Sequence, residues 1–131
     1  MTDSLFTKID CVRIPVTSLD AGIDFYSTKL NHQIIWRTET SVGLQLKDDK
    51  SEIVLYIEPA GLEIDFKVDN VQDAIEAFVQ AGGSIVTGPF EIPIGLCVVV
   101  RDPWNNEYVL LDSSKGNFET DENKRVIGLK K

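Results

Sequence analysis

Hydrophobic and polar residues alternate strictly in two short segments 52 residues apart, at 11–16 and 63–68. Alternation with a period of two is typical of a half-buried β-strand. At the same offset, each segment is followed by apolar residues four and then three positions apart, which form the stripe of an amphipathic helix. These residues are Leu19, Ile23 and Tyr26 in the first copy, and Val71, Ile75 and Phe78 in the second. The pattern indicates two copies of one strand–helix unit.

Each unit continues into three further strand-like segments. They are predicted at 33–38, 42–47 and 52–58 in the first copy, and at 84–87, 96–101 and 107–111 in the second. Residues 48–50 and 103–106 have the composition of hairpin turns. Pro89 and Pro93 predict a loop before the segment at 96–101. Ser18 is the predicted N-cap of the first helix, and Asp69 or Asn70 that of the second.

We therefore predict an α+β fold in which two βαβββ modules form a curved mixed sheet that lines a cleft. The helix of each module must cover one face of its opening strand. The opposite face of that strand is therefore expected to line the cleft. The predicted boundaries are 1–58 for the first module, 59–61 for a linker and 62–112 for the second module. The polar tail, 113–131, is expected to be loosely held or to pack on a partner subunit.

Composition narrows the classes of function. The 131 residues carry a formal net charge of -8, from 13 basic and 21 acidic residues. This balance argues against nucleic acid as a partner, because phosphate binding needs Lys and Arg. No apolar run is long enough for a membrane span, and the N-terminus lacks the features of a signal peptide, so we expect a cytoplasmic protein with no membrane partner. The two cysteines, Cys11 and Cys97, do not indicate a disulfide framework.

The histidine content excludes several catalytic sites. His32 is the only histidine, so one chain cannot supply a 2-His-1-carboxylate iron site or an HExxH zinc site. His32 lies in a polar segment at a predicted helix end, where a solvated role is expected. The chain also contains neither glycine-rich phosphate-binding motif, GxxxxGK[ST] or GxGxxG.

Two segments resemble the vicinal-oxygen-chelate superfamily, which includes glyoxalase I, bleomycin-resistance proteins and extradiol dioxygenases. Residues 9–20, IDCVRIPVTSLD, followed by Phe25-Tyr26, are similar to the opening strand and helix of that family. Residues 101–112, RDPWNNEYVLLD, are similar to its DPxGN hairpin, with Asn105 in place of the usual glycine. Asparagine tolerates the left-handed turn conformation, so this departure is mild. The resemblance covers about residues 8–113 and implies the paired βαβββ fold. It implies no particular reaction, because this scaffold supports many chemistries.

The resemblance also places four metal-ligand positions. In metal-dependent members of the family, inward side chains from the first and last strand of each module hold the metal. Those positions fall at Cys11, Leu55, Glu63 and Val109 of this chain. Two of them are aliphatic, and two donors make a poor metal site. We therefore predict no tightly bound metal and no cofactor.

Without a metal, the predicted inner face suits a small organic ligand. It is mostly apolar, with one aromatic residue and a few charges, as small-molecule sites commonly are. The acidic charge favours a cationic ligand. The resemblance to bleomycin-resistance proteins implies a bulky ligand that a homodimer sequesters between its subunits. The residues predicted to bind the ligand are Cys11, Arg13, Trp36, Leu55, Glu63, Asp65 and Val109, and the same face is predicted to include Ile53, Ile57 and Leu111.

Three alternatives remain open. The charged residues of this face, Arg13, Glu63 and Asp65 among them, could simply pair across neighbouring strands. Cys11 could be a buried apolar filler, and Trp36 a core residue. The protein could also be a glyoxalase-like lyase or an isomerase that uses Glu63 or Asp65 as a general base, or a non-catalytic interaction protein.

Overall fold

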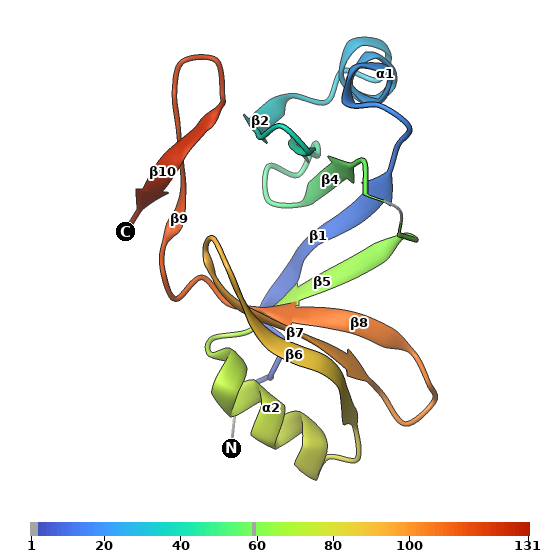
Figure 1. The fold of residues 1–131 in the computed structure, drawn as a ribbon, viewed down its shortest axis with the longest axis vertical. Coiled ribbons are helices and arrows are strands. Elements are labelled where there is room, and N and C mark those ends of the chain that lie inside the picture. The colour runs from blue at the N-terminus through green and yellow to red at the C-terminus, as the bar shows by residue number, and fades with distance from the viewer. Residues whose placement is uncertain (1–2, 59) are drawn as a thin grey trace. The chain divides into compact units, whose positions relative to one another are not determined.

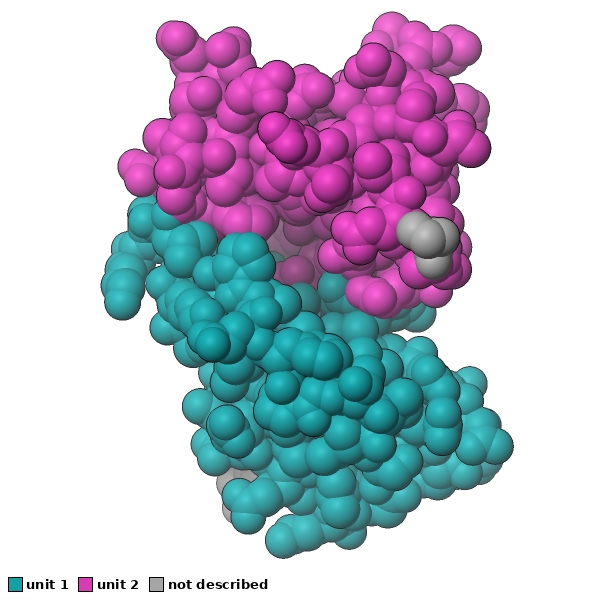
Figure 2. Space-filling model, in the orientation of Figure 1, with its two compact units in different colours: residues 1–9, 64–117, 129–131 teal, residues 10–63, 118–128 magenta. Residues whose placement is uncertain are grey.

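A computed structural model of the protein describes residues 3–58 and 60–131, so Pro59 of the predicted linker lies outside the described residues. The strands and helices form two compact units, coloured separately in Figure 2. Residues 10–63 and 118–128 form one unit, which holds most of the first βαβββ copy, hereafter the first module. The other unit comprises residues up to 9, 64–117 and 129–131 and holds the second copy, hereafter the second module.

The first module contains the four predicted strands and a helix (Figure 1). Its elements are β1 (Lys8–Pro15), α1 (Leu19–Ile23), the π-helical segment η1 (Asp24–Lys29), β2 (Ile34–Arg37), β3 (Ser41–Gln45) and β4 (Glu52–Tyr56). The strand order is β2-β3-β4-β1, with β1 parallel to β4 and the other neighbours antiparallel. The Ser18 side chain accepts a hydrogen bond from the Ala21 N–H at 3.1 Å, which confirms the predicted N-cap.

The second module repeats this plan. Its elements are β5 (Glu63–Lys67), α2 (Val71–Gln80), β6 (Ser84–Ile92), β7 (Gly95–Arg101) and β8 (Glu107–Leu111). The strand order is β6-β7-β8-β5, with β5 parallel to β8. Asn70, rather than Asp69, caps α2 by accepting from the Asp73 N–H at 2.9 Å. The α+β class and both βαβββ modules are thus as predicted from the sequence.

The apolar stripe of each helix packs against its own hydrophobic core. Beneath α1, the buried residues Val42, Leu44 and Leu55 pack with Leu19 and Tyr26 of the helical segments, among others. The core beneath α2 is larger and more aromatic, with Phe66 and Tyr108 packed against its buried residues, which are Val68, Val71, Ala74, Phe78, Val98, Val100 and Leu110. In the opening strand of each module, the alternation that predicted the strand therefore also identified the face that the helix covers.

Two segments differ from the prediction. The strand β6 does not end at Thr87 but continues through Pro89 to Ile92, and its register with β7 shifts on both sides of Thr87. Proline is tolerated there because β6 lies at the edge of its strand group. The tail, for which no strand was predicted, forms a ribbon of β9 (Asn117–Thr120) and β10 (Val126–Lys130). In the described part of the chain, no helix has the length and apolar character that crossing a bilayer requires.

Candidate functional site

The candidate site lies on the face of the first module's sheet that is opposite α1, hereafter the open face. Ile14, Ile53 and Leu55 point toward the core beneath α1. Because side chains alternate along a strand, Cys11 and Arg13 of β1 and Glu52, Val54 and Tyr56 of β4 lie on the other side. The open face therefore combines a thiol, a guanidinium, a carboxylate and a phenol on two adjacent parallel strands, with Cys11 and Tyr56 buried and Arg13 and Glu52 half-buried.

Trp36 reaches the open face because β2 contains a bulge. Ile34 lies opposite Leu44 and packs in the core beneath α1, whereas Trp36 lies opposite Gly43 after a register shift. A β-bulge re-aims the side chains that follow it, and here it turns the indole to the opposite face. The indole lies so close to Gly43 that any Cβ at that position would collide with it.

Two further contacts fix the indole. The Trp36 Nε1–H donates a hydrogen bond to a carboxylate oxygen of Glu52. The ring of Phe118, from the start of the C-terminal ribbon, lies against it with ring centroids 5.0 Å apart and the planes tilted by 55°. Trp36 is thus a half-buried aromatic surface held by a carboxylate on one side and a ring on the other.

Arg13 is the cation of the open face. Its guanidinium lies over the ring of Tyr56, 4.5 Å from the centroid, in a cation–π arrangement. Its Nε is 3.7 Å from a carboxylate oxygen of Glu63, and both side chains are about one-third exposed. The alternative that these charges pair with one another is therefore correct for Arg13 and Glu63.

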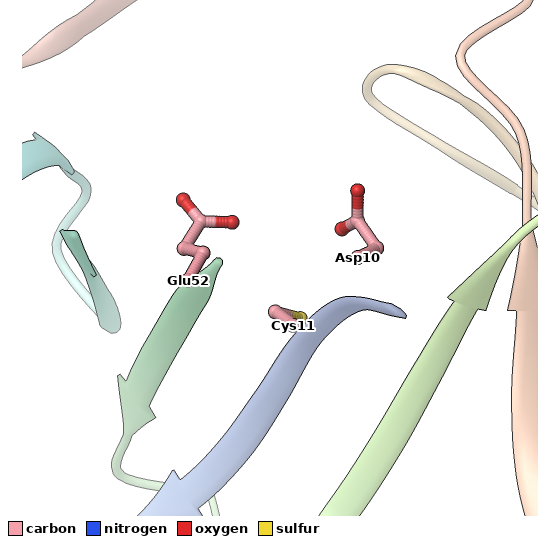
Figure 3. A group of neighbouring side chains, drawn as sticks. All are labelled: Asp10, Cys11 and Glu52. Carbon is pink, nitrogen blue, oxygen red and sulfur yellow. The ribbon is translucent and has the colours of Figure 1, made fainter. Parts of the chain in front are cut away.

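Three potential metal ligands cluster at the start of β1 and β4. One ligand atom from each of Asp10, Cys11 and Glu52 lies within 4.8 Å of the other two. Figure 3 shows Cys11 between the two carboxyl groups in this view. Cys11 is buried, with 4% of its surface exposed, and Asp10 and Glu52 are half-buried. A thiolate with two carboxylates is a donor set that Zn²⁺ accepts, although structural zinc sites usually have four ligands.

The second module presents a different surface opposite α2. Asp65 lies opposite Val109 in the β5–β8 register, and Lys67 lies opposite Leu111. Asp65, Val109 and Leu111 are all buried, with at most 7% of their surface exposed. The structure thus places Asp65 and Val109 on the face where the sequence predicted them, in aliphatic surroundings.

The expectation that Leu55 and Ile53 line the same face as Cys11 is wrong. Leu55 is fully buried beneath α1, and a Cβ at Gly22 of that helix would lie 3.1 Å from the Leu55 side chain. Ile53 packs against the same core. The sequence assignment was displaced by one residue, and in a strand such a displacement moves a side chain to the opposite face. Ile57 lies beyond the end of β4 and is 43% exposed.

The internal repeat corrects the assignment of the family's ligand positions. Arg13 lies opposite Val54, and Asp65, which follows Arg13 by 52 residues, lies opposite Val109. Val54 is therefore the counterpart of Val109, and the four positions become Cys11, Val54, Glu63 and Val109. Two of them still carry no donor atom, so these residues do not fit the family's four-ligand site. The convergence of Asp10, Cys11 and Glu52 is a separate arrangement, which the sequence prediction missed.

Sequence reasoning also missed Glu52, Phe118 and Asp112. The alternation Glu52, Val54, Tyr56 could have revealed Glu52, had Leu55 been assigned to the core. Phe118 belongs to the tail, which carried no strand prediction. Asp112 is 1% exposed and accepts hydrogen bonds from the backbone N–H groups of Val71, Leu96 and Ser114. Burial alone would raise the pKa of Asp112, but these bonds and one from the Ser114 hydroxyl hold it below its ordinary value.

The family model of the Glyoxalase/Bleomycin resistance protein/Dioxygenase superfamily matches residues 8–110. No curated protein sequence matches the chain. Several solved structures are similar at low identity. One is titled an NAD-dependent benzaldehyde dehydrogenase from Legionella pneumophila, with 21% identity and a TM-score of 0.66, and the match covers 79% of this chain and 98% of that one.

Two other similar structures are those of an epimerase and a dioxygenase. Methylmalonyl-CoA epimerase from Mycobacterium tuberculosis is 15% identical, with a TM-score of 0.71, and the match covers 87% of this chain and 93% of that one. A variant of homoprotocatechuate 2,3-dioxygenase from B. fuscum is 21% identical, with a TM-score of 0.59, over 82% of this chain and 33% of that one. At these identities the similarity shows the fold and leaves the chemistry to the residues of the site.

Proposed function

Because the chain belongs to the Glyoxalase/Bleomycin resistance protein/Dioxygenase superfamily, we propose that it is a metal-independent protein that binds a small organic ligand on the open face of its first module. The observation that supports this proposal is the position of Trp36. Its ring is fixed by Glu52 and Phe118 and lies on the same face as Cys11 and Arg13. A rigid aromatic surface beside carboxylates suits a cationic or extended aromatic molecule, because the ring face and the negative charge both attract a cation.

Metal independence rests on the donor set. Of the family's four positions, Val54 and Val109 have no donor, and the Glu63 carboxylate pairs with Arg13. The cluster of Asp10, Cys11 and Glu52 is the rival arrangement. In the ligand-binding proposal, Glu52 acts as an acceptor for the Trp36 indole rather than as a metal ligand. Metal analysis of protein purified without chelator separates the two, since near-stoichiometric zinc, iron, manganese or nickel that is lost in Glu52→Gln would refute metal independence.

Ligand binding is testable through the indole itself. In a Trp104→Phe background, Trp36 is the only tryptophan, so its fluorescence reports the open face. We expect saturable quenching by a subset of a panel of cationic aromatic compounds. Glu63→Gln and Glu52→Gln should weaken binding by removing negative charge, whereas Glu107→Gln, on the second module's hairpin, serves as a matched control. Absence of quenching across the panel would favour the non-catalytic interaction protein.

An enzymatic role stays an alternative. Asp65 is a buried carboxylate beside Val109, and a general base needs such a positioned carboxylate within reach of the substrate proton. Turnover of a hemithioacetal or α-keto substrate that disappears in Asp65→Asn or Glu63→Gln would establish it. Binding without turnover, unchanged in Asp65→Asn, would leave the ligand-binding proposal in place.

We also propose a homodimer, while the cytoplasmic location stays a prediction. The edge strand β6 exposes Ile85, Val86 and Phe90, and Trp104 in the β7–β8 turn is 79% exposed. Edge strands with exposed apolar side chains are surfaces on which a second chain can pair. Sedimentation analysis should give a dimer for the intact chain, and Phe90→Lys should shift the equilibrium toward monomer. A concentration-independent monomer would contradict the dimer.

A further inference from the structure

A hollow lies in the first module, away from the cluster of Asp10, Cys11 and Glu52. It is open to solvent, has a volume of about 520 Å³ and lies at the ends of β1, β2 and β4. Its lining comprises Thr17, Ser18, Leu19, Asp20, Arg37, Thr38, Glu39, Ile57 and Arg125. Cys11 and Glu52 lie near the starts of the same parallel strands, so Thr17 is about 20 Å further along the chain at the rise of an extended strand. The hollow therefore lies at the opposite end of these strands from Cys11 and Glu52, and its Arg37 follows Trp36 directly in β2.

Two arginines from distant parts of the chain meet at this hollow. The Arg37 backbone N–H at the end of β2 donates to the Lys124 carbonyl at 2.9 Å, and Arg37 and Arg125 form a parallel β-bridge. The Asp121 carboxylate organises the turn that delivers Arg125, by accepting from the N–H groups of Asn123 at 2.8 Å and Arg125 at 3.0 Å. The backbone thus holds two like charges next to each other, an arrangement that is unfavourable unless something neutralises them.

No side chain in the described ranges 3–58 and 60–131 neutralises these arginines. Neither Arg37 nor Arg125 forms an ion pair there, and the Arg37 Nε is buried without a hydrogen-bond acceptor. Asp20 and Glu39 line the same hollow, but both are exposed and neither reaches an arginine. A buried donor of a charged group without an acceptor is costly, so these guanidinium groups are suited to an acceptor from outside the chain.

In the second module, the place that corresponds to this hollow is occupied by an acceptor from the chain itself, the carboxylate of Asp112. The Val68 N–H bonds the Leu111 carbonyl just as the Val16 N–H bonds the Tyr56 carbonyl, so Asp112 and Ile57 are counterparts. The Asp112 carboxylate contacts Val71, whose counterpart Leu19 lines the hollow together with Ile57. The first module therefore lacks a carboxylate at the position where the second module buries one.

We propose that this hollow binds an oxyanion, the phosphate or carboxylate group of a small molecule, between Arg37 and Arg125. The guanidinium fork matches the two oxygens of such a group, and the charge-assisted bonds would satisfy the buried Arg37 Nε. Thr17 adds a hydroxyl donor, whereas the Thr38 hydroxyl is engaged with Ser41, and Leu19 and Ile57 provide an apolar wall for the rest of the molecule.

The test is calorimetric titration of the full chain with inorganic phosphate, and separately with acetate, at constant ionic strength. We expect saturable binding of at least one anion, and the two titrations distinguish a phosphate site from a carboxylate site. Arg125→Ala, in an exposed side chain, should weaken binding by about tenfold or more, and Arg37→Ala by at least as much. Glu39→Gln should tighten it, because a like charge leaves the rim.

Lys47→Ala is the matched control, since it removes one exposed positive charge from the same module and should leave binding unchanged. Urea unfolding of each variant shows whether it is folded, and Arg125→Lys, which keeps the charge but loses the fork, covers the case in which Arg37→Ala is unstable. The proposal is overturned if neither anion binds saturably, or if binding is the same in Arg125→Ala and Lys47→Ala.

Discussion

The two modules share one chain plan and differ in what they place opposite their helices. In the first module, Gly43 and Glu52 let Trp36 lie flat on the open face. Val54 of the first module lies opposite Gly43 in the β3–β4 pair. Its counterpart in the second module, Val109, lies opposite Val99 in the β7–β8 pair. The repeat thus keeps apolar side chains at the positions beneath the helices, whereas on the other face it keeps a valine at Val54 and Val109 but places Gly43 in one module where the other has Val99. We therefore expect stability to depend on the residues that the copies share, and the proposed ligand binding to depend on those that differ.

The shared part is tested by the two leucines beneath the helices. Leu55 and Leu110 are counterparts and both are fully buried. Leu55→Ala and Leu110→Ala should each lower the free energy of unfolding by about 2–5 kcal/mol, because each leaves a cavity in a packed core. Urea denaturation measures both. A Leu55→Ala variant that keeps its stability but loses ligand binding would mean that Leu55 faces the ligand after all.

The difference between the open faces is tested by exchanging one residue. Gly43→Val introduces the second module's Val99 at the position over which the Trp36 indole lies. Overpacking should destabilise the protein by about 1–3 kcal/mol, and displacing the indole from Glu52 should shift the fluorescence of Trp36 in the Trp104→Phe background. Val99→Ala is the control in the other module and should leave that fluorescence unchanged. An unshifted Trp36 spectrum in Gly43→Val would contradict the role of Gly43.

These residues also show what the sequence could predict. Alternation and helical spacing identified the paired strands and the core stripes, because burial on one face imposes those periods directly. The position of Leu55 was wrong by one residue because the apolar run Ile53-Val54-Leu55 has no polar residue to fix which face is buried. Trp36 was placed on the correct face, but the bulge that puts it there leaves no mark in composition. The contact with Phe118 depends on tertiary packing, which local patterns do not contain.

The buried carboxylate of the second module gives a pH-dependent contrast. Because the pKa of Asp112 is lower in the folded protein than in the unfolded chain, its stabilisation is complete above the unfolded pKa of about 3.9 and is lost as the pH falls through the folded value. Asp112→Asn should cost about 1–2 kcal/mol near neutral pH, since at least one of the N–H donors loses its acceptor. Urea unfolding from pH 7 to pH 3 should show this difference shrinking below pH 4. A pH-independent difference would contradict the role of the ionised carboxylate.

The smallest expected effect makes the modules more alike. Ile57→Asp introduces a carboxylate at the counterpart of Asp112, in a hollow that already contains Arg37 and Arg125. Because the site is partly open to solvent, the gain in stability should be below about 1 kcal/mol. The same variant should lose phosphate and acetate binding, because the new carboxylate pairs with the two guanidinium groups. The control Ile57→Asn has a side chain of the same size as aspartate but no charge, and it should retain binding. If Ile57→Asp bound the anions as well as the unaltered chain does, the correspondence between the hollow and the Asp112 position would fail, even though both modules follow one plan.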